Sequence, residues 1–134
     1  MIIQNELLGT LVLLRPNDIP ELQNKIGSIC SELIEDNTVV VNLNGDFPIS
    51  FSVHELFVLR NPEEIEKSAN NDYELLPSWN YGDIMEVAIL ANSPHEQERI
   101  GAIELSAKDP DVFEYTMTSL AEELGLNQCY NISR

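Results

Sequence analysis

The stretch TVVVNLNGDFPISFSVHELFVL, from Thr38 to Leu59, decides the fold of the first half of the chain. Apolar and polar residues alternate on both sides of Asn44-Gly45, a pattern typical of two antiparallel strands joined by a short turn. Asn and Gly tolerate the positive φ angles that a two-residue hairpin turn requires, so this dipeptide predicts a tight β-hairpin. The segment SVHE, from Ser52 to Glu55, predicts a single tight turn before a last strand, LFVL.

Two further strands are expected before this hairpin. Thr10 to Leu14 forms a short apolar run that Pro16 ends, and a second run, IGSICSELI, begins at Ile26 after a long polar loop. Cys30 has apolar neighbours in the second run and is interpreted as a small core residue. Residues 1–60 therefore predict five short strands.

The order of these elements is strand, long loop, strand, turn, strand, tight hairpin, strand, one-turn bend and strand. Over residues 9–60 this order resembles the Src-homology-3-like small β-barrel, including its KOW-type variants, in which a glycine opens the second strand as Gly27 does in NKIGSI. The resemblance implies a five-stranded barrel but no ligand. KOW-type barrels that bind nucleic acid carry basic residues around that glycine, and here only Lys25 is near. The aromatic pairs that peptide-binding members use are missing from the long loop.

Residues 61–134 are predicted to be helical. Asn61 as a cap, Pro62 in the first position and acidic residues directly after them indicate the start of a helix. From Gly82 to Asn92 both faces are apolar, which predicts a buried helix, with a strand as the alternative. The chain thus belongs to the α+β class, with a small β-barrel domain over residues 1–60 and a helical region over residues 61–134.

Two more helices are expected at the end of the chain. Ser93 to Glu96 has the form of a capping box, which predicts a helix that runs to about Lys108. Asp109-Pro110 predicts a last helix that Gly125 ends, and the two would form a helical hairpin joined by KDP. One apolar stripe of the last helix would comprise Phe113, Met117, Leu120 and Leu124.

The charge is the most unusual property of the composition. The chain has 23 acidic and 7 basic residues, for a formal net charge of −16. Residues 1–60 carry 3 basic and 8 acidic residues (−5), and residues 61–134 carry 4 and 15 (−11). Because nucleic acids and anionic membranes are also negative, the sequence predicts no binding to either. The acidity either keeps the protein in solution or faces a basic protein partner.

Trp79 and Tyr81 are the candidate interaction residues. They stand together in PSWNYGD, in a polar segment interpreted as a linker between helices. Two aromatic side chains in a loop can anchor a protein interface. The alternative is that Trp79 fills the junction between the strands and the helices.

No pattern of catalytic, cofactor-binding or metal-binding residues stands out. His54 and His95 are the two histidines, and HEQER departs from the HExxH zinc motif because Arg99 replaces the second histidine. The glycines form no phosphate-binding loop, and Cys30 and Cys129 can form one disulfide but no cysteine cluster. We therefore expect no enzymatic activity, no cofactor and no metal.

The expected class is a cytoplasmic protein-binding module. The start MIIQNELLGT lacks the basic segment and apolar run of a signal peptide, and no apolar run is long enough for a transmembrane helix. A protein partner is expected. The alternative function is an acidic antagonist, either an immunity-type protein or a nucleic-acid mimic, that neutralises a basic partner.

Overall fold

The computed structural model describes residues 7–16, 18–31, 35–43 and 48–125. Within these residues the chain is an α+β protein with an antiparallel sheet. Its strands are β1 (Leu11–Leu14), β2 (Ile26–Ile29), β3 (Thr38–Leu43), β4 (Ile49–Ser52), β5 (Leu56–Leu59) and β6 (Met117–Ser119). Its helices are α1 (Pro62–Asn71), α2 (Ser78–Ala91), α3 (Glu96–Lys108), α4 (Pro110–Thr116) and α5 (Leu120–Glu123). Short 3-10 turns are η2 (Pro20–Leu22), η3 (Glu35–Asn37), η4 (Val53–Glu55) and η5 (Tyr73–Leu75).

The chain divides into two compact units. The strand unit comprises Met1–Val58 together with Thr118–Arg134, and the helical unit comprises Leu59–Met117. The chain from Thr118 onward thus groups with the strands, whereas the sequence places it with the helices.

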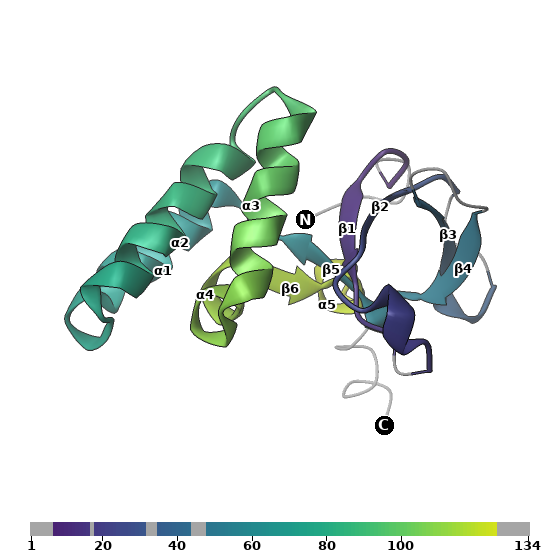
Figure 1. The fold of residues 1–134 in the computed structure, drawn as a ribbon, viewed down its shortest axis with the longest axis horizontal. Coiled ribbons are helices and arrows are strands. Elements are labelled where there is room, and N and C mark those ends of the chain that lie inside the picture. The colour runs from purple at the N-terminus through teal and green to yellow at the C-terminus, as the bar shows by residue number, and fades with distance from the viewer. Residues whose placement is uncertain (1–6, 17, 32–34, 44–47, 126–134) are drawn as a thin grey trace. The chain divides into compact units, whose positions relative to one another are not determined.

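The strand order is β4-β3-β2-β1-β5-β6, so among the described residues β4 and β6 are the edges of an open six-stranded sheet. Within this described part the sheet has six strands and not five, because β6 comes from the region over residues 61–134 that was predicted to be helical. The five expected strands are present, and the tight turn predicted at Asn44-Gly45 lies outside the described residues. In Figure 1 the strands from β1 to β4 curve around a common interior.

The interior of the strand unit is filled by alternate residues of the strands. Val39, Val41 and Leu43 of β3 are buried, as the alternation of TVVVNL predicts, and Phe51 of β4 is buried beside them. The predicted bend is η4, which is held by a capping box. Ser52 Oγ accepts a hydrogen bond from the His54 amide (3.2 Å), and Glu55 Oε1 accepts one from the Ser52 amide (3.1 Å).

Cys30, which follows β2, lies on the exposed face of the sheet and not on the buried face that the sequence suggested. Gly27 and Ile29 are buried, so the pleat directs the next residue, Cys30, away from the interior. Cys30 is an exposed free thiol whose Sγ donates to the Val40 carbonyl (3.5 Å). The interpretation of Cys30 as a core residue was therefore wrong, and Cys129 lies outside the described residues.

The first helix begins as the sequence predicts. The Asn61 side chain caps α1 by accepting a hydrogen bond from the Glu63 amide (2.8 Å), with Pro62 in the first position. The segment from Gly82 onward is part of α2, so the alternative of a strand was wrong. Asp109 likewise caps α4, since Asp109 Oδ1 accepts from the Asp111 amide (2.9 Å).

The capping box predicted at Ser93 is not formed. The Ser93 hydroxyl accepts from the His95 amide (3.0 Å) and pairs with Glu98, and α3 begins only at Glu96. The N-cap residue of α3 is His95, which lies before the helix, so this hydrogen bond to the His95 amide makes a local turn and does not cap α3.

The single helix predicted from Asp109 to Gly125 is interrupted by β6. α4 ends at Thr116, whose carbonyl accepts a hydrogen bond from the Arg60 amide (2.8 Å) at the end of β5. Ser119 then caps α5 by accepting from the Glu122 amide (3.1 Å), and Gly125 follows with a φ of 78°. The predicted stop at Gly125 is confirmed, but the pairing partner of Thr116 is remote in sequence and was not foreseen.

Candidate functional site

Trp79 and Tyr81 lie in the first turns of α2 and not in a linker. α2 begins at Ser78 after Pro77, whose carbonyl accepts the Tyr81 amide (3.0 Å) and so starts the helical hydrogen-bond series. Trp79 is 70% exposed. Its indole therefore lies at the surface of the helical unit, and the alternative that Trp79 fills the junction between the strands and the helices stays a prediction.

Tyr81 is held in place by neighbours on both sides. Its ring meets that of Tyr73 edge to face, with the ring centroids 4.8 Å apart and an interplanar angle of 84°. Its hydroxyl donates to Asn70 Oδ1 (2.7 Å) at the end of α1. Tyr81 is thereby partly buried and fixed, whereas Tyr73 (59%) and Leu75 (80%) stand exposed on η5. The sequence did not single out these two residues because they fell in the supposed linker.

α2 carries exposed apolar residues along its outer face. Trp79, Gly82, Glu86 and Ile89 follow at intervals of three, four and three residues, so they share one side of the helix. All four are exposed, and Ile89 is 67% exposed. The opposite side, which includes Ile84 and Val87, is buried in the core of the helical unit. The ridge from Trp79 to Ile89 is about 15 Å long, given a rise of about 1.5 Å per residue.

A groove lies between the start of α1 and the end of α2. Its volume is about 460 Å³, and its lining from α1 includes Asn61, Glu63 and Glu66. Ala88, Ile89 and Asn92 line it from α2. The lining mixes apolar and polar residues, and Ile89 with two carboxylates opposite it can take an aliphatic side chain that ends in a positive charge.

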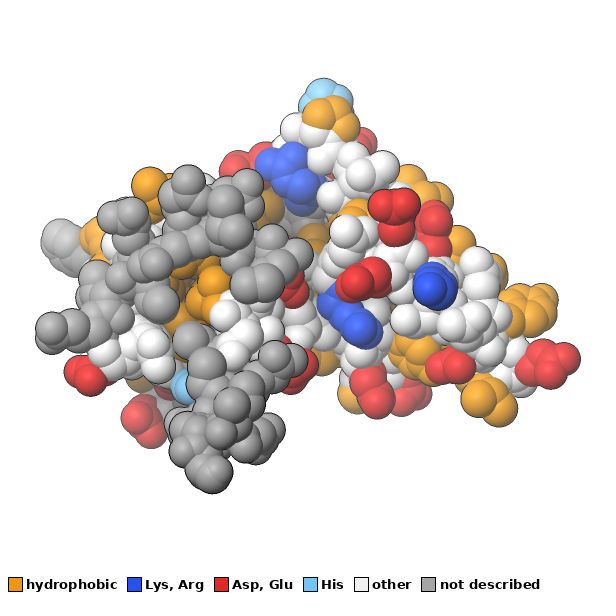
Figure 2. Space-filling view, turned by 180° about the vertical axis from the view of Figure 1, so that it is seen from behind, with side chains coloured by type: hydrophobic (Ala, Val, Ile, Leu, Met, Phe, Trp, Pro, Cys, Tyr) orange, Lys and Arg blue, Asp and Glu red, His pale blue; other side chains and the backbone are white. Residues whose placement is uncertain are grey.

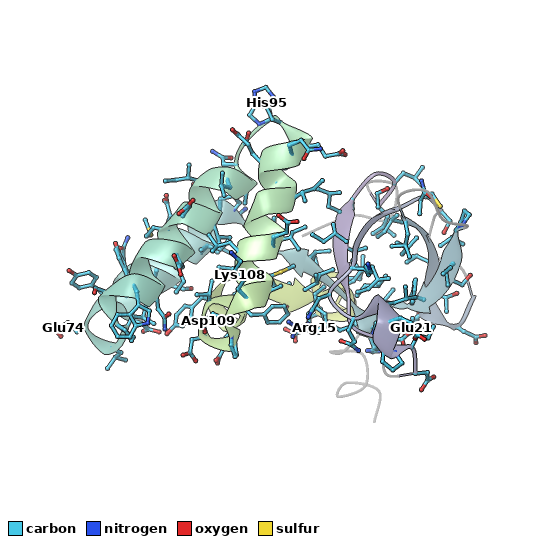
Figure 3. The ribbon with its side chains drawn as sticks, in the orientation of Figure 1. Arg15, Glu21, Glu74, His95, Lys108 and Asp109 are labelled. Atoms are coloured by element: carbon cyan, nitrogen blue, oxygen red, sulfur yellow. The ribbon has the colours of Figure 1, made fainter. Side chains whose placement is uncertain are left out.

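The helical unit as a whole is strongly acidic. Leu59–Met117 contains 4 basic and 13 acidic residues, a net charge of −9. Figure 2 shows acidic side chains spread over this unit with fewer basic ones among them. Figure 3 marks Glu74 at the turn from α1 towards α2, and His95 at the turn between α2 and α3. In the sequence, acidic residues stand before α2 (Glu74), within it (Asp83 and Glu86) and after it (Glu96).

One carboxylate of this unit is held by a tyrosine. The Tyr115 hydroxyl of α4 donates to Asp72 Oδ2 (2.6 Å) at the end of α1. This hydrogen bond, partial burial and the negative charge of Asp72 raise the pKa of Tyr115 to about 12. The pair joins the end of α1 to α4, so we assign it a structural role.

Other polar side chains suggest no further site. His54 on η4 and His95 before α3 are both exposed. Within the described ranges no three His, Cys, Asp or Glu side chains gather as metal ligands would. Asn80 is buried, and its Oδ1 has no hydrogen-bond partner among the described residues. No described helix combines the length and the apolar character needed to cross a membrane.

Comparison of the chain with protein-family models, with curated proteins and with solved structures finds no match in any of the three. The assignment of function therefore depends on the ridge and the groove of the helical unit.

Proposed function

We propose that this protein is a non-enzymatic protein-binding module, or a subunit of an assembly, that holds its partner on the helical unit. The observation that carries this proposal is the exposure of Trp79, Ile89, Leu75 and Tyr73 in one unit of the chain, between 59% and 80%. Large apolar side chains grouped at a surface are typical of interfaces, and Trp and Tyr contribute most to binding energy.

The strand unit is the scaffold in this proposal. We propose that it is a Src-homology-3-like small barrel and that α3 and α4 form a helical hairpin. The curvature of β1 to β4, their shared apolar interior and the glycine in β2 support the barrel (Figure 1). The free thiol of Cys30 supports a reducing compartment such as the cytoplasm.

The test removes two exposed aromatic side chains, of which Tyr73 also contacts the ring of Tyr81. Native extract would be passed over the immobilised wild-type protein and over a Trp79→Ser, Tyr73→Ser variant, whose replaced side chains are exposed. We expect the wild type to retain a partner that the variant loses. The control variant is Leu8→Ser, at a residue of the strand unit that is 55% exposed. Ile26 of the same unit is half-buried and is therefore left unchanged. Identical capture by all three proteins would contradict the proposal.

The second candidate is an acidic antagonist, of the immunity type or a nucleic-acid mimic, that neutralises a basic partner. The net charge of −9 on the helical unit favours it. Association driven by opposite charges falls with salt, because ions screen exposed charges over a Debye length of about 8 Å at physiological ionic strength. Retention of the main partner at high salt would therefore count against the antagonist, whereas loss would show that the partner is basic, as the antagonist requires.

A further inference from the structure

We propose that the outer face of α2, together with the groove between α1 and α2, binds a basic amphipathic helix of a partner protein. This inference rests on the proposed function and states the chemistry of the partner. The apolar side of the partner helix would lie on Trp79 and Ile89. Its lysine or arginine side chains would meet Glu63 and Glu66.

The shape of the site fits a helix. The ridge from Trp79 to Ile89 is about 15 Å long, which matches about three turns of a partner helix. Gly82 lies between the two large residues, and a Cβ placed on it would meet nothing within 4 Å. A partner can therefore come close to the α2 backbone there and contact a large apolar residue on each side.

The backbone of this surface also favours a helix over an extended peptide. An added strand gains its affinity from main-chain hydrogen bonds along a sheet edge. The walls of the groove are the start of α1 and the end of α2, so they present no sheet edge to which a strand could add. A partner helix satisfies its own backbone and needs only side-chain contacts, which the ridge and the groove provide.

The charges indicate that the partner is basic. Glu63 and Glu66 are three residues apart on one face of α1, both exposed, and no residue that lines the groove is basic. Glu86 lies on the outer face of α2, one turn before Ile89. The apolar ridge thus has carboxylates beside it on both helices. A second copy of this chain, at −16, and a nucleic acid would both be repelled.

The probe is a labelled Leu/Lys peptide of about four helical turns, with its leucines on one face. Two control peptides are used: one with the same residues in an order that spreads the leucines around the helix, and one with glutamate in place of lysine. Binding to the full-length protein is measured by fluorescence anisotropy at low salt. We expect the amphipathic basic peptide to bind at least tenfold more tightly than either control.

Variants then locate the site. Glu63→Lys with Glu66→Lys should weaken peptide binding at least tenfold, and Ile89→Ser at least fivefold. The matched control is Glu96→Lys with Glu104→Lys, which reverses two exposed carboxylates of α3 in the same unit and should change binding less than twofold. Equal losses in both double variants would mean that general acidity alone attracts the peptide, and would overturn the proposal. So would equal binding of the peptide with the shuffled order.

The extract experiment separates this inference from the proposed function. If the natural partner requires Trp79 and Tyr73 but is retained by the Glu63→Lys, Glu66→Lys variant, the groove is not the site and the protein remains a binding module. If that double variant also loses the partner while the α3 control keeps it, the groove and the basic chemistry of the partner are both supported.

Discussion

Gly27 lies where β2 and β3 approach each other closely. A Cβ at this position would lie 2.6 Å from Val41 Cγ1 and 2.9 Å from both the Asn42 carbonyl oxygen and Leu43 Cδ2. β2 pairs with β3 here, with Gly27 opposite Leu43. The glycine that resembles the KOW-type pattern is therefore required by the close approach of one strand to the next and not by an unusual backbone conformation.

Gly27→Ala should consequently destabilise the fold. Forcing a methyl group into this space shifts β3 or its side chains, at a cost of about 1–3 kcal/mol in the free energy of unfolding. The matched control is Gly82→Ala in α2, where nothing lies within 4 Å and alanine favours the helix by about 0.5–1 kcal/mol. Chemical denaturation of both variants measures the difference. A Gly27→Ala variant as stable as the wild type would show that β2 and β3 are not packed this closely.

At the scale of single elements, the sequence predicted best what depends on adjacent residues. The caps at Asn61 and Asp109 and the bend at Ser52 are local hydrogen bonds, and all three form as expected. The break after Thr116 depends on the Arg60 amide, 56 positions earlier in the chain, which bonds the Thr116 carbonyl (2.8 Å). Tertiary pairing of this kind overrides a helical pattern that is otherwise correct.

From the sequence, the start of the second helix was expected at Gly82, whereas α2 begins at Ser78. The polar residues before Trp79 suggested a linker, yet the Pro77 carbonyl already accepts the first helical amide from Tyr81. The apolar second face of this segment was evident from the sequence, and it includes Ile89. Whether that face is buried or exposed depends on which side of α2 packs against its neighbours, so the sequence could indicate Trp79 but not the ridge.

The hydrogen bond between Tyr115 and Asp72 joins α4 to the end of α1, and we expect it to stabilise the helical unit. Tyr115→Phe should lower the free energy of unfolding at neutral pH by about 1 kcal/mol, a reduced value because both groups are partly exposed. Because folding raises the pKa of Tyr115 from 10.0 to about 12, its contribution is complete below pH 10 and is lost as the pH rises towards 12.

This dependence can be measured by titrating tyrosinate absorbance and by denaturation at several pH values. Asp72→Asn removes the negative charge but keeps an acceptor, so the pKa of Tyr115 should return towards 10.0. The stability difference between wild type and Tyr115→Phe should shrink above pH 10. A difference that stays constant up to pH 12 would show that the hydroxyl is not bound to Asp72 as the structure places it.

At the scale of the whole molecule, the charge of −16 opposes folding while it favours a basic partner. Like charges are closer together in the folded chain than in the unfolded one, so screening should stabilise the fold. An increase in sodium chloride from about 0.01 M to about 0.15 M shortens the Debye length from about 30 Å to about 8 Å. We expect the midpoint of thermal unfolding to rise over this range, while affinity for a basic peptide falls.

The two effects have opposite signs because salt screens repulsion within the chain and attraction to the partner alike. The double variant Glu96→Lys, Glu104→Lys replaces a negative by a positive charge at each position, so the net charge changes from −16 to −12. Its unfolding midpoint should depend less on salt than that of the wild type, and its peptide affinity should remain nearly unchanged. A midpoint that falls with added sodium chloride would mean that attractive ion pairs, and not repulsion, dominate the electrostatics of the fold. In that case repulsion among the acidic residues would not destabilise the fold, and a basic partner would gain no affinity by reducing that repulsion.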